Sequence, residues 1–301
     1  MHDKDILFES NIPNLKLIAR GKVRDIYDLD DDHLLIVTTD RLSAYDVVMP
    51  DAVPGKGKIL TEISNFWFNM MQDLVPNHLT GINLEQCIND EKLLLQLRKR
   101  TIIVKKLKPL PIEAVVRGYL IGSGWRDYEK TGKICGISIS ENMQQAEKLP
   151  DTIFTPATKA ASGDHDENIN YAKTCSLVGE ELANNVRDIA IKIYERAAHY
   201  ALERGIIIAD TKFEFGLDRN NKLFIIDEML TPDSSRFWPR DEYQIGISPP
   251  SYDKQFLRDY LDTLTWNKKS PGPTLPESVI SETYKKYYEA YDILVLSLIH
   301  I

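Results

Sequence analysis

Hydrophobic and polar positions in the first third of the chain predict short strands joined by turns. Runs over residues 22–27 and 34–39 are rich in β-branched and aromatic residues, and the acidic turn between them predicts a hairpin. Apolar residues after Gly55 recur at the spacing of one helix face. Residues 101–104 again read as a strand. Two prolines in 105–111 predict a hinge, where we place a boundary between two lobes.

Beyond the hinge, the pattern alternates between strands and longer helices. Residues 112–120 predict a strand, which a short helix ending near Gly132 follows. The clearest helix covers 177–204, with Gly205 as its stop. The segments 206–215 and 223–228 predict two strands of a hairpin.

A last helix is predicted to start near Pro276 and to turn Ile280 and several tyrosines, Tyr288 among them, toward the body of the protein. Together these elements predict an α+β fold. Its first lobe, residues 1–108, is rich in strands. Its second lobe, residues 109–301, is larger, has a sheet flanked by helices, and ends in this helix.

Composition and charge narrow the class of protein. The 301 residues are 43% hydrophobic and 27% charged, which excludes collagen-like and wholly disordered chains. A net charge of −8 argues against a protein that holds a nucleic-acid backbone. No apolar run approaches the roughly 20 residues of a membrane span, so we expect a cytosolic protein. Three widely spaced cysteines predict buried free thiols.

A charged strand is the densest candidate site. Strand alternation puts Asp210, Lys212 and Glu214 on one face, and the partner strand can add Asp227. Carboxylate oxygens of this kind are ligands for Mg²⁺, which keeps waters and phosphate oxygens as its other ligands. A solvated sheet face, with Lys212 paired to a neighbour, is the alternative. The apolar flanking residues make solvation less favourable, and the two interpretations remain open.

A second candidate is a phosphate site. Arg117 lies in the apolar strand predicted over 112–120, and Ser123 lies between two glycines at the start of a helix. A guanidinium group, a hydroxyl and free amides at a helix start suit a phosphate. Arg236 could add a second guanidinium. A structural salt bridge with Ser123 as helix N-cap explains the same residues equally well.

The first lobe offers a weaker signal in the segment Gly21–Tyr27. It lacks the spacing of a P-loop or of a dinucleotide-binding motif, and leaves a glycine turn with Lys22 and Arg24 on one face of a strand. That arrangement could cover nucleotide phosphates. Residues 41–46 otherwise read as ordinary turn chemistry. The histidines show no metal-ligand spacing, and no motif for covalent catalysis is present.

Two segments, Leu110–Ser123 and Ile208–Gly216, resemble the signature segments of the SAICAR synthetase family, the phosphoribosylaminoimidazole-succinocarboxamide synthases of purine biosynthesis. Further matches follow in order: Gly21–Asp25, Arg41–Asp46, Phe154–Pro156, Asp227–Glu228 and Thr231–Arg236. The resemblance extends from Leu15 to Tyr291 and is closest to the longer, fungal-like form. The apolar tail Val295–Ile301 matches nothing in the family.

The resemblance implies a carbon–nitrogen ligase that uses ATP and Mg²⁺. It would join L-aspartate to the carboxylate of CAIR, 5-amino-1-(5-phosphoribosyl)imidazole-4-carboxylate, and give SAICAR, ADP and phosphate. ATP would first phosphorylate the carboxylate, because a carboxylate is a poor acceptor for an amine. Such a site needs alignment and neutralised charge more than a protein nucleophile. The resemblance also implies a two-lobed fold with an ATP cleft between the lobes, and favours a monomer.

The same resemblance implies roles for individual residues. It implies that Mg²⁺ is held by Glu214 and Asp227. It implies that the reacting groups are oriented by Asp210, Lys212 and Glu228. It implies that the phosphates of ATP contact Gly21, Lys22 and Arg24, and that the adenine lies beside Lys105 and Lys106. It implies that the ribonucleotide phosphate is bound by Arg117, Ser123 and Arg236, with Asp233 close by. The candidates for binding aspartate are Lys159, His165 and Asp166.

Two other functions fit parts of the sequence. A kinase or another carboxylate–amine ligase would use the same kind of nucleotide site, since one fold serves several chemistries. ATP mixed with CAIR, with and without aspartate, would separate these reactions. A non-catalytic nucleotide sensor would bind without reacting. The facing charges of residues 210–214 argue against a sensor, because binding alone has little need of them.

Overall fold

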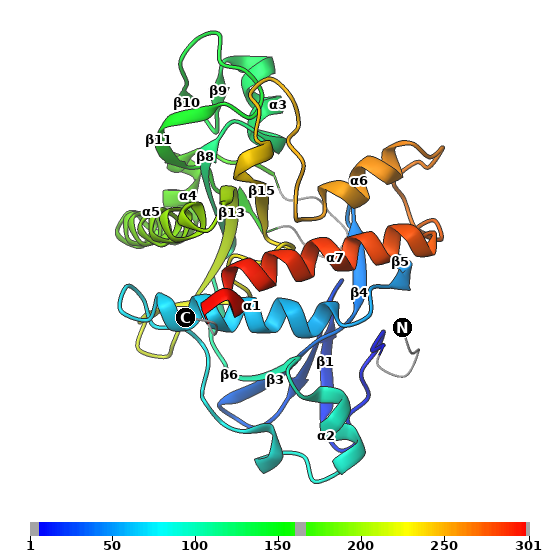
Figure 1. The fold of residues 1–301 in the computed structure, drawn as a ribbon. Helices are drawn as coiled ribbons and strands as arrows, with labels where there is room; N and C mark the ends of the chain where they lie inside the picture. Colours follow the sequence, from blue (N-terminus) through cyan, green and yellow to red (C-terminus); the bar gives the residue numbers. More distant parts are fainter. Residues whose placement is uncertain (1–5, 160–166, 299–301) are drawn as a thin grey trace. The chain divides into compact units, whose positions relative to one another are not determined.

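The computed structural model describes residues 6–159 and 167–298, and their helices and antiparallel strands confirm the predicted α+β class (Figure 1). By their contacts, the described residues fall into two units. Unit 1 comprises those within 1–66, 78–107 and 253–301, and unit 2 comprises 67–77 and 108–252.

Unit 1 contains a four-stranded antiparallel sheet and a separate hairpin. The sheet order is β1–β2–β3–β6, with β1 Lys16–Arg20, β2 Arg24–Asp28, β3 His33–Thr38 and β6 Thr101–Lys105. The separate hairpin joins β4 Arg41–Ala44 to β5 Val47–Ala52. The predicted hairpin near residue 30 is confirmed, since Arg24 pairs with Thr38 and Asp28 with Leu34. Leu35 and Val37 are fully buried in the core beneath this sheet.

The helices of unit 1 are α1 Lys56–Met70, which continues into unit 2, α2 Glu91–Leu97, α6 Gln255–Asp262 and α7 Glu277–Leu294, with 3-10 turns η2 Leu84–Gln86 and η4 Leu296–Leu298. The start of α1 after Gly55 and of α7 after Pro276 is as predicted. α7 runs beside α1 in Figure 1, and Tyr291 Oη donates to Glu62 Oε2 over 3.1 Å. The predicted inward direction of Tyr288 is wrong. Its side chain is exposed, because the buried stripe of α7 passes through Thr283 and Tyr287.

The division into units differs from the predicted lobes of 1–108 and 109–301. The chain does change unit after Leu107, but residues 253–301 group with unit 1. An apolar cluster explains this grouping, because Leu257 and Val279 pack with Leu42 and Met49 of the β4–β5 hairpin. Residues 67–77 group with unit 2, where Trp67 makes an edge-on contact with Tyr200 at 5.4 Å between ring centroids.

Unit 2 is built on a seven-stranded antiparallel sheet with β13 at its centre. The order is β11–β8–β13–β14, β12 also pairs with β8, and β7 and β15 pair with β13. The strands are β7 Lys108–Pro109, β8 Ile112–Tyr119, β11 Lys148–Phe154, β12 Ala157–Thr158, β13 Ile206–Leu217, β14 Leu223–Ile226 and β15 Ser235–Pro239. A small hairpin joins β9 Lys133–Ile134 to β10 Ile137–Ser138.

The helices of unit 2 are α3 Gly122–Thr131, α4 Tyr171–Val178 and α5 Glu180–Glu203, with a 3-10 turn η3 Arg240–Glu242. The single helix predicted over 177–204 is therefore wrong at its start. Gly179, with φ +88°, separates α4 from α5. α5 covers the sheet beside β13 (Figure 1), and Tyr194 Oη donates to the Ile208 carbonyl over 2.7 Å. Its predicted stop at Gly205 is confirmed by φ +84°.

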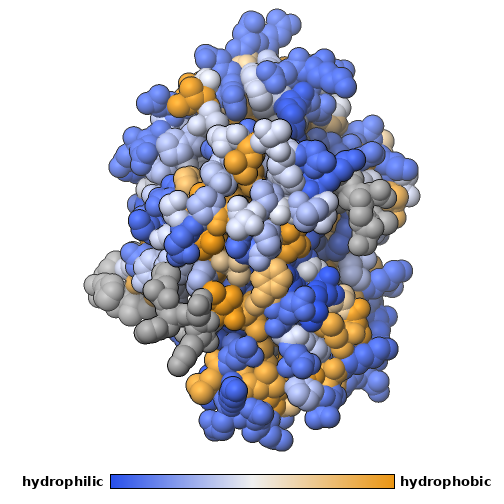
Figure 2. Space-filling view, turned by 90° about the vertical axis from the view of Figure 1, so that its right-hand side faces the viewer, coloured by the Kyte–Doolittle hydropathy of each residue, from blue (hydrophilic) through white to orange (hydrophobic). Residues whose placement is uncertain are grey.

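Cysteines and surface residues behave largely as the composition predicts. All three cysteines are free thiols, and only Cys135 is buried, where burial raises its pKa to about 11. On the face seen in Figure 2, hydrophilic residues predominate and hydrophobic ones form smaller groups among them. No helix within residues 6–159 and 167–298 has the length and apolar character needed to cross a bilayer.

Candidate active site

Strand alternation along β13 separates a polar face from the core. Phe213 and Phe215 are buried on one side, whereas Asp210, Lys212 and Glu214 carry ion pairs on the other. The cross-strand register agrees, because Asp210 lies directly opposite Arg117 of β8 and Arg236 of β15. Since side chains directly opposite each other share a face, three adjacent strands bring these groups together. The predicted common face is therefore confirmed.

The first group on this face is a cluster of two arginines around one carboxylate. Arg117 Nη1 and Arg236 Nη1 both donate to Asp210 Oδ2, over 2.6 and 2.5 Å. Asp210 and Arg117 are almost fully buried, and the Arg236 side chain is 23% exposed. Burial lowers the pKa of Arg117, Asp210 raises it, Arg236 lowers it again, and the net pKa lies below its ordinary value. With two guanidinium groups against one carboxylate, the cluster can attract an additional anion.

Ser123 and Thr155 fix the orientation of Arg117. Its Nη2 donates to Ser123 Oγ over 2.8 Å, and its Nε donates to Thr155 Oγ1 over 2.9 Å. Ser123 is not the N-cap of α3, which is Ile121, so its hydroxyl serves the guanidinium group. The salt bridge of the structural alternative is therefore present and its serine N-cap is not, while the phosphate site stays a prediction.

The two glycines beside Ser123 make room for the arginines. Gly122 has φ +62°, and a Cβ on it would lie 2.3 Å from Arg236 Nη2. A Cβ on Gly124 would lie 3.1 Å from Arg117 Cδ. A side chain at either position would therefore press on a guanidinium group of the cluster, most severely at Gly122.

Lys212 forms the second group, together with Glu113 of β8. Its Nζ donates to Glu113 Oε1 over 2.5 Å, and the Glu113 side chain is 7% exposed. Burial by itself lowers the pKa of Lys212, but the negative charges of Glu113 and Glu214 outweigh it and raise the pKa. The neighbouring carboxylates therefore favour the charged form of this ammonium group.

Glu214, Asp227 and Lys159 form the third group, one strand step further along β13. Glu214 accepts a hydrogen bond from Lys159 Nζ. β14 ends at Ile226, opposite Glu214, so the strand predicted to reach residue 228 stops earlier, and Asp227 adopts φ +64°. Burial, followed by the nearby charge of Asp227, raises the pKa of Glu214 despite Lys159. Two carboxylates that are incompletely neutralised fit a divalent cation.

A cation held here would rely on few protein ligands. Within the part of the chain that the structure describes, no group of three or more His, Cys, Asp or Glu residues is arranged to hold a metal ion. The two carboxylates of Glu214 and Asp227 nevertheless suit Mg²⁺, which commonly takes one or two protein carboxylates and completes its shell with water and phosphate oxygens.

The other predicted residues of unit 2 lie after β14. Glu228 Oε2 accepts a hydrogen bond from Thr231 Oγ1 over 2.6 Å, and Thr231 Oγ1 accepts one from the Asp233 N–H over 3.2 Å. This turn leads directly into β15 and Arg236. Lys159 was predicted to contact aspartate and here contacts Glu214. His165 and Asp166 lie outside the described residues.

The predicted nucleotide residues of unit 1 lie at two places. Gly21 and Lys22 form the exposed turn between β1 and β2, Arg24 begins β2, and the Lys22 ammonium pairs with Asp46. Lys105 ends β6, and Lys106 Nζ pairs with Asp28 Oδ1 at 2.5 Å.

Two residues that contact predicted side chains were missed by sequence reasoning, Glu113 beside Lys212 and Thr155 beside Arg117. Glu113 could have been found, because it lies four positions before Arg117 on the same strand and so shares its face. Thr155 gave no such signal. It follows β11 and reaches Arg117 only through the pairing of distant segments.

Comparisons with known proteins agree on one family. Residues 17–273 match the family model for SAICAR synthetase. A phosphoribosylaminoimidazole-succinocarboxamide synthase of Methylococcus capsulatus is 58% identical over 286 residues, covering 95% of this chain and 96% of the relative. One of Thioalkalivibrio sulfidiphilus is 59% identical over 284 residues, covering 94% and 96%.

A solved structure of SAICAR synthase from Saccharomyces cerevisiae, complexed with SAICAR, matches with a TM-score of 0.88 and 44% identity, covering 96% of this chain and 97% of that chain. SAICAR synthetase from Pyrococcus horikoshii shares the fold at a TM-score of 0.64 and 23% identity, covering 90% and 96%. The closer likeness to the yeast protein agrees with the predicted fungal-like form.

Proposed function

Because the chain belongs to the SAICAR synthetase family, it is a ligase that joins aspartate in purine biosynthesis, and we propose which of its residues perform each part of that reaction. The substrates are CAIR, L-aspartate and ATP. The observation that carries the proposal is the polar face of β13. Its arginine cluster at Asp210 and its carboxylate pair at Glu214 lie four residues apart along the strand. At 3.3 Å per residue, this separation is about 13 Å.

We expect the reaction to pass through an acyl phosphate. A carboxylate oxygen of CAIR attacks the γ-phosphorus of ATP, a P–O bond forms, and ADP leaves. The amine of aspartate then attacks the acyl carbon, a C–N bond forms, the C–O bond to phosphate breaks, and the amine releases a proton. Every reactant is an anion, so the site must align the groups and neutralise charge.

The arginine cluster supplies the seat for the ribonucleotide 5′-phosphate. Arg117, Arg236 and Ser123 provide donors, and charge-assisted bonds from guanidinium to phosphate are among the strongest hydrogen bonds in proteins. Asp210 was expected to orient the nucleotide and the reacting carboxylate. Its contacts with both arginines support another role, which is to hold the two guanidinium groups side by side.

Lys212 and the carboxylate pair serve the reacting end. The positive charge of Lys212, which Glu113 and Glu214 favour by raising its pKa, suits a residue that holds the CAIR carboxylate during phosphoryl transfer. Glu214 and Asp227 would hold Mg²⁺, which would neutralise charge on the ATP phosphates. Glu228 and Asp233, fixed by Thr231, remain candidates beside this end, and Lys159 remains a candidate for the aspartate carboxylates once Glu214 binds the cation.

The unit 1 residues complete the proposal with contacts to ATP. Lys22 and Arg24, at the Gly21 turn, would contact the phosphates, and the segment of Lys105 and Lys106 would lie beside adenine. The support is the exposed position of the turn and the positive charge of these four side chains.

A steady-state assay of ADP release tests the function as a whole. We expect release to require both CAIR and L-aspartate, with SAICAR formed in equal amount. ADP released with CAIR alone at the full rate would indicate a kinase. Nucleotide binding with no release under any combination would indicate a sensor.

A Glu113→Gln variant tests the role of Lys212. Glu113 opposes the lowering of the Lys212 pKa by burial, so the pKa falls when Glu113 is replaced. The ammonium group then loses its proton at a lower pH than in the wild type. We expect kcat to fall about tenfold at neutral pH and activity to decline earlier as the pH rises. The measurement is a pH profile of kcat/KM for CAIR from pH 6 to 10. Superimposable profiles of variant and wild type would contradict this role.

A further inference from the structure

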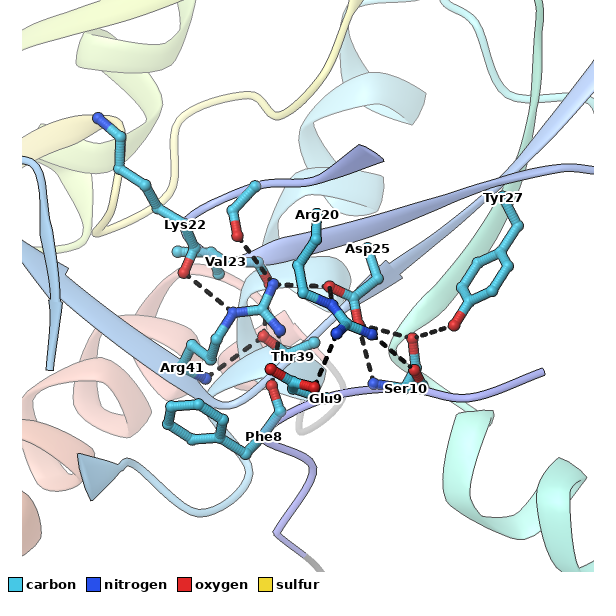
Figure 3. A network of polar contacts seen from close by, with 11 residues as sticks. Phe8, Glu9, Ser10, Arg20, Lys22, Val23, Asp25, Tyr27, Thr39 and Arg41 are labelled. Carbon is cyan, nitrogen blue, oxygen red and sulfur yellow. Dashed lines mark hydrogen bonds and ion pairs between the residues drawn. The ribbon is translucent and has the colours of Figure 1, made fainter. Parts of the chain in front are cut away.

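The exposed turn between β1 and β2 keeps its three carbonyl oxygens on the inner side. Arg41 Nη2 donates to the Gly21 carbonyl over 2.9 Å and Arg41 Nε to the Lys22 carbonyl over 3.2 Å. The Val23 carbonyl accepts from both Thr39 Oγ1 and the Thr39 N–H, over 2.6 and 2.9 Å. Figure 3 shows Arg41 beneath the turn, with the Lys22 side chain running away from it.

Arg41 is itself fixed from the other side. Its side chain is 3% exposed, its Nη1 donates to the Phe8 carbonyl over 2.6 Å, and its Nη2 also donates to Asp25 Oδ1 over 2.7 Å. Asp25 is fully buried and also accepts from Ser10 and Arg20 (Figure 3). A guanidinium group with this many fixed partners cannot rotate away from the turn.

The inward carbonyls determine where the amides of the turn point. In a trans peptide the C=O and the following N–H point in opposite directions. The N–H groups of Lys22 and Val23 therefore point toward the outer, solvent side. No described residue accepts a hydrogen bond from either of them. Successive outward N–H groups form a concave donor site for an anion, and a carbonyl turned outward would repel the same anion.

We propose that Arg41 and Thr39 are positioning residues, which hold the carbonyls of the Gly21–Val23 turn inward so that the Lys22 and Val23 amides bind phosphate oxygens of ATP. The inference rests on the proposed contact between this turn and the nucleotide. Arg41 and Thr39 would act through the turn and would not contact the nucleotide themselves.

Two variants test the inference. Arg41→Lys keeps the positive charge beside Asp25 but cannot bond both carbonyls in the same geometry, and Thr39→Val keeps the shape while removing the hydroxyl donor. We expect the Kd of a non-hydrolysable ATP analogue and the KM for ATP to rise about tenfold in Arg41→Lys and severalfold in Thr39→Val. Adenosine affinity and the KM values for CAIR and aspartate should stay within twofold.

A matched control separates positioning from stability. Arg100 is as deeply buried in unit 1 and pairs with fully buried Asp40 over 2.9 Å, so Arg100→Lys disturbs a comparable ion pair. We expect it to lower Tm without selective loss of ATP affinity. Equal loss of ATP affinity in Arg41→Lys and Arg100→Lys would overturn the inference. If Arg41→Lys does not fold, the test rests on Thr39→Val. Unchanged ATP affinity in Thr39→Val would then overturn the inference.

A Lys22→Met variant distinguishes this inference from the proposed function. If Lys22→Met weakens ATP binding and the Arg41 and Thr39 variants do not, the turn binds nucleotide and the positioning role is wrong. If all three variants bind ATP as the wild type does, the proposed contact between the turn and the nucleotide is itself wrong.

Discussion

A Glu214→Gln variant should lose turnover while remaining folded, and in metal-free, nucleotide-free buffer it should be at least as stable as the wild type. The loss follows because glutamine cannot provide the charged ligand that Mg²⁺ needs. We expect kcat to fall by about a thousandfold or more. The variant should gain stability, although it loses activity, because burial and Asp227 raise the pKa of Glu214 in the wild type. A carboxyl group with a raised pKa destabilises the folded state once it ionises, so the neutral amide removes that cost at neutral pH.

Activity and thermal unfolding measured side by side check this prediction. Mg²⁺ with an ATP analogue should raise the Tm of the wild type by ligand binding and raise that of Glu214→Gln much less. Glu203→Gln is the control, since its side chain is exposed on α5 and its kcat should not change. Near-normal kcat in Glu214→Gln would contradict the magnesium assignment. A clear fall in its Tm without ligands would contradict the electrostatic argument. Asp227→Asn should also lose turnover.

An Arg117→Met variant should raise the KM for CAIR about a hundredfold and also lower the stability of the protein. A lost charge-assisted contact to phosphate is worth about 2–3 kcal/mol, which corresponds to that change in affinity. The stability loss arises because Thr155 and buried Asp210 each lose a partner. The measurements are the KM for CAIR with ATP and aspartate saturating, and the urea midpoint of unfolding.

Arg236→Met separates binding from folding at the same site. The Arg236 side chain is partly exposed, so its removal should cost less stability, while the KM for CAIR should still rise at least tenfold. Arg196→Met provides a surface control, because Arg196 lies on α5 and pairs with exposed Asp73, and neither residue contacts the arginine cluster. An unchanged KM for CAIR in both cluster variants would refute the phosphate seat.

Local pattern was enough to predict most elements, and the errors have local physical causes. The two hairpins and the starts of α1 and α7 followed from turn residues and periodicity. The long helix was predicted to run through Gly179, where a left-handed backbone conformation separates two helices. Tyr288 was placed inward because aromatic residues suggested a buried stripe, whereas Tyr287 occupies the buried position.

The candidate site was predictable by residue type but not by grouping. Alternation alone placed Asp210, Lys212 and Glu214 on one face. Their division among three partners depends on strand register, which pairs residue 210 with residue 117 across a long stretch of chain. A single sequence does not reveal such long-range register. This is why Asp210 was predicted beside the reacting groups with Lys212 rather than between the two arginines, and why Thr155 was missed.

The composition of unit 1 from distant segments has a consequence for synthesis on the ribosome. The apolar cluster around Leu42 and Met49 needs Leu257, Leu261 and Val279, which emerge only after all of unit 2 has been translated. Domains commonly fold in the order in which they leave the exit tunnel. Here the nascent chain can complete the later unit first, and the β4–β5 hairpin must wait for the last helices before its apolar cluster can form.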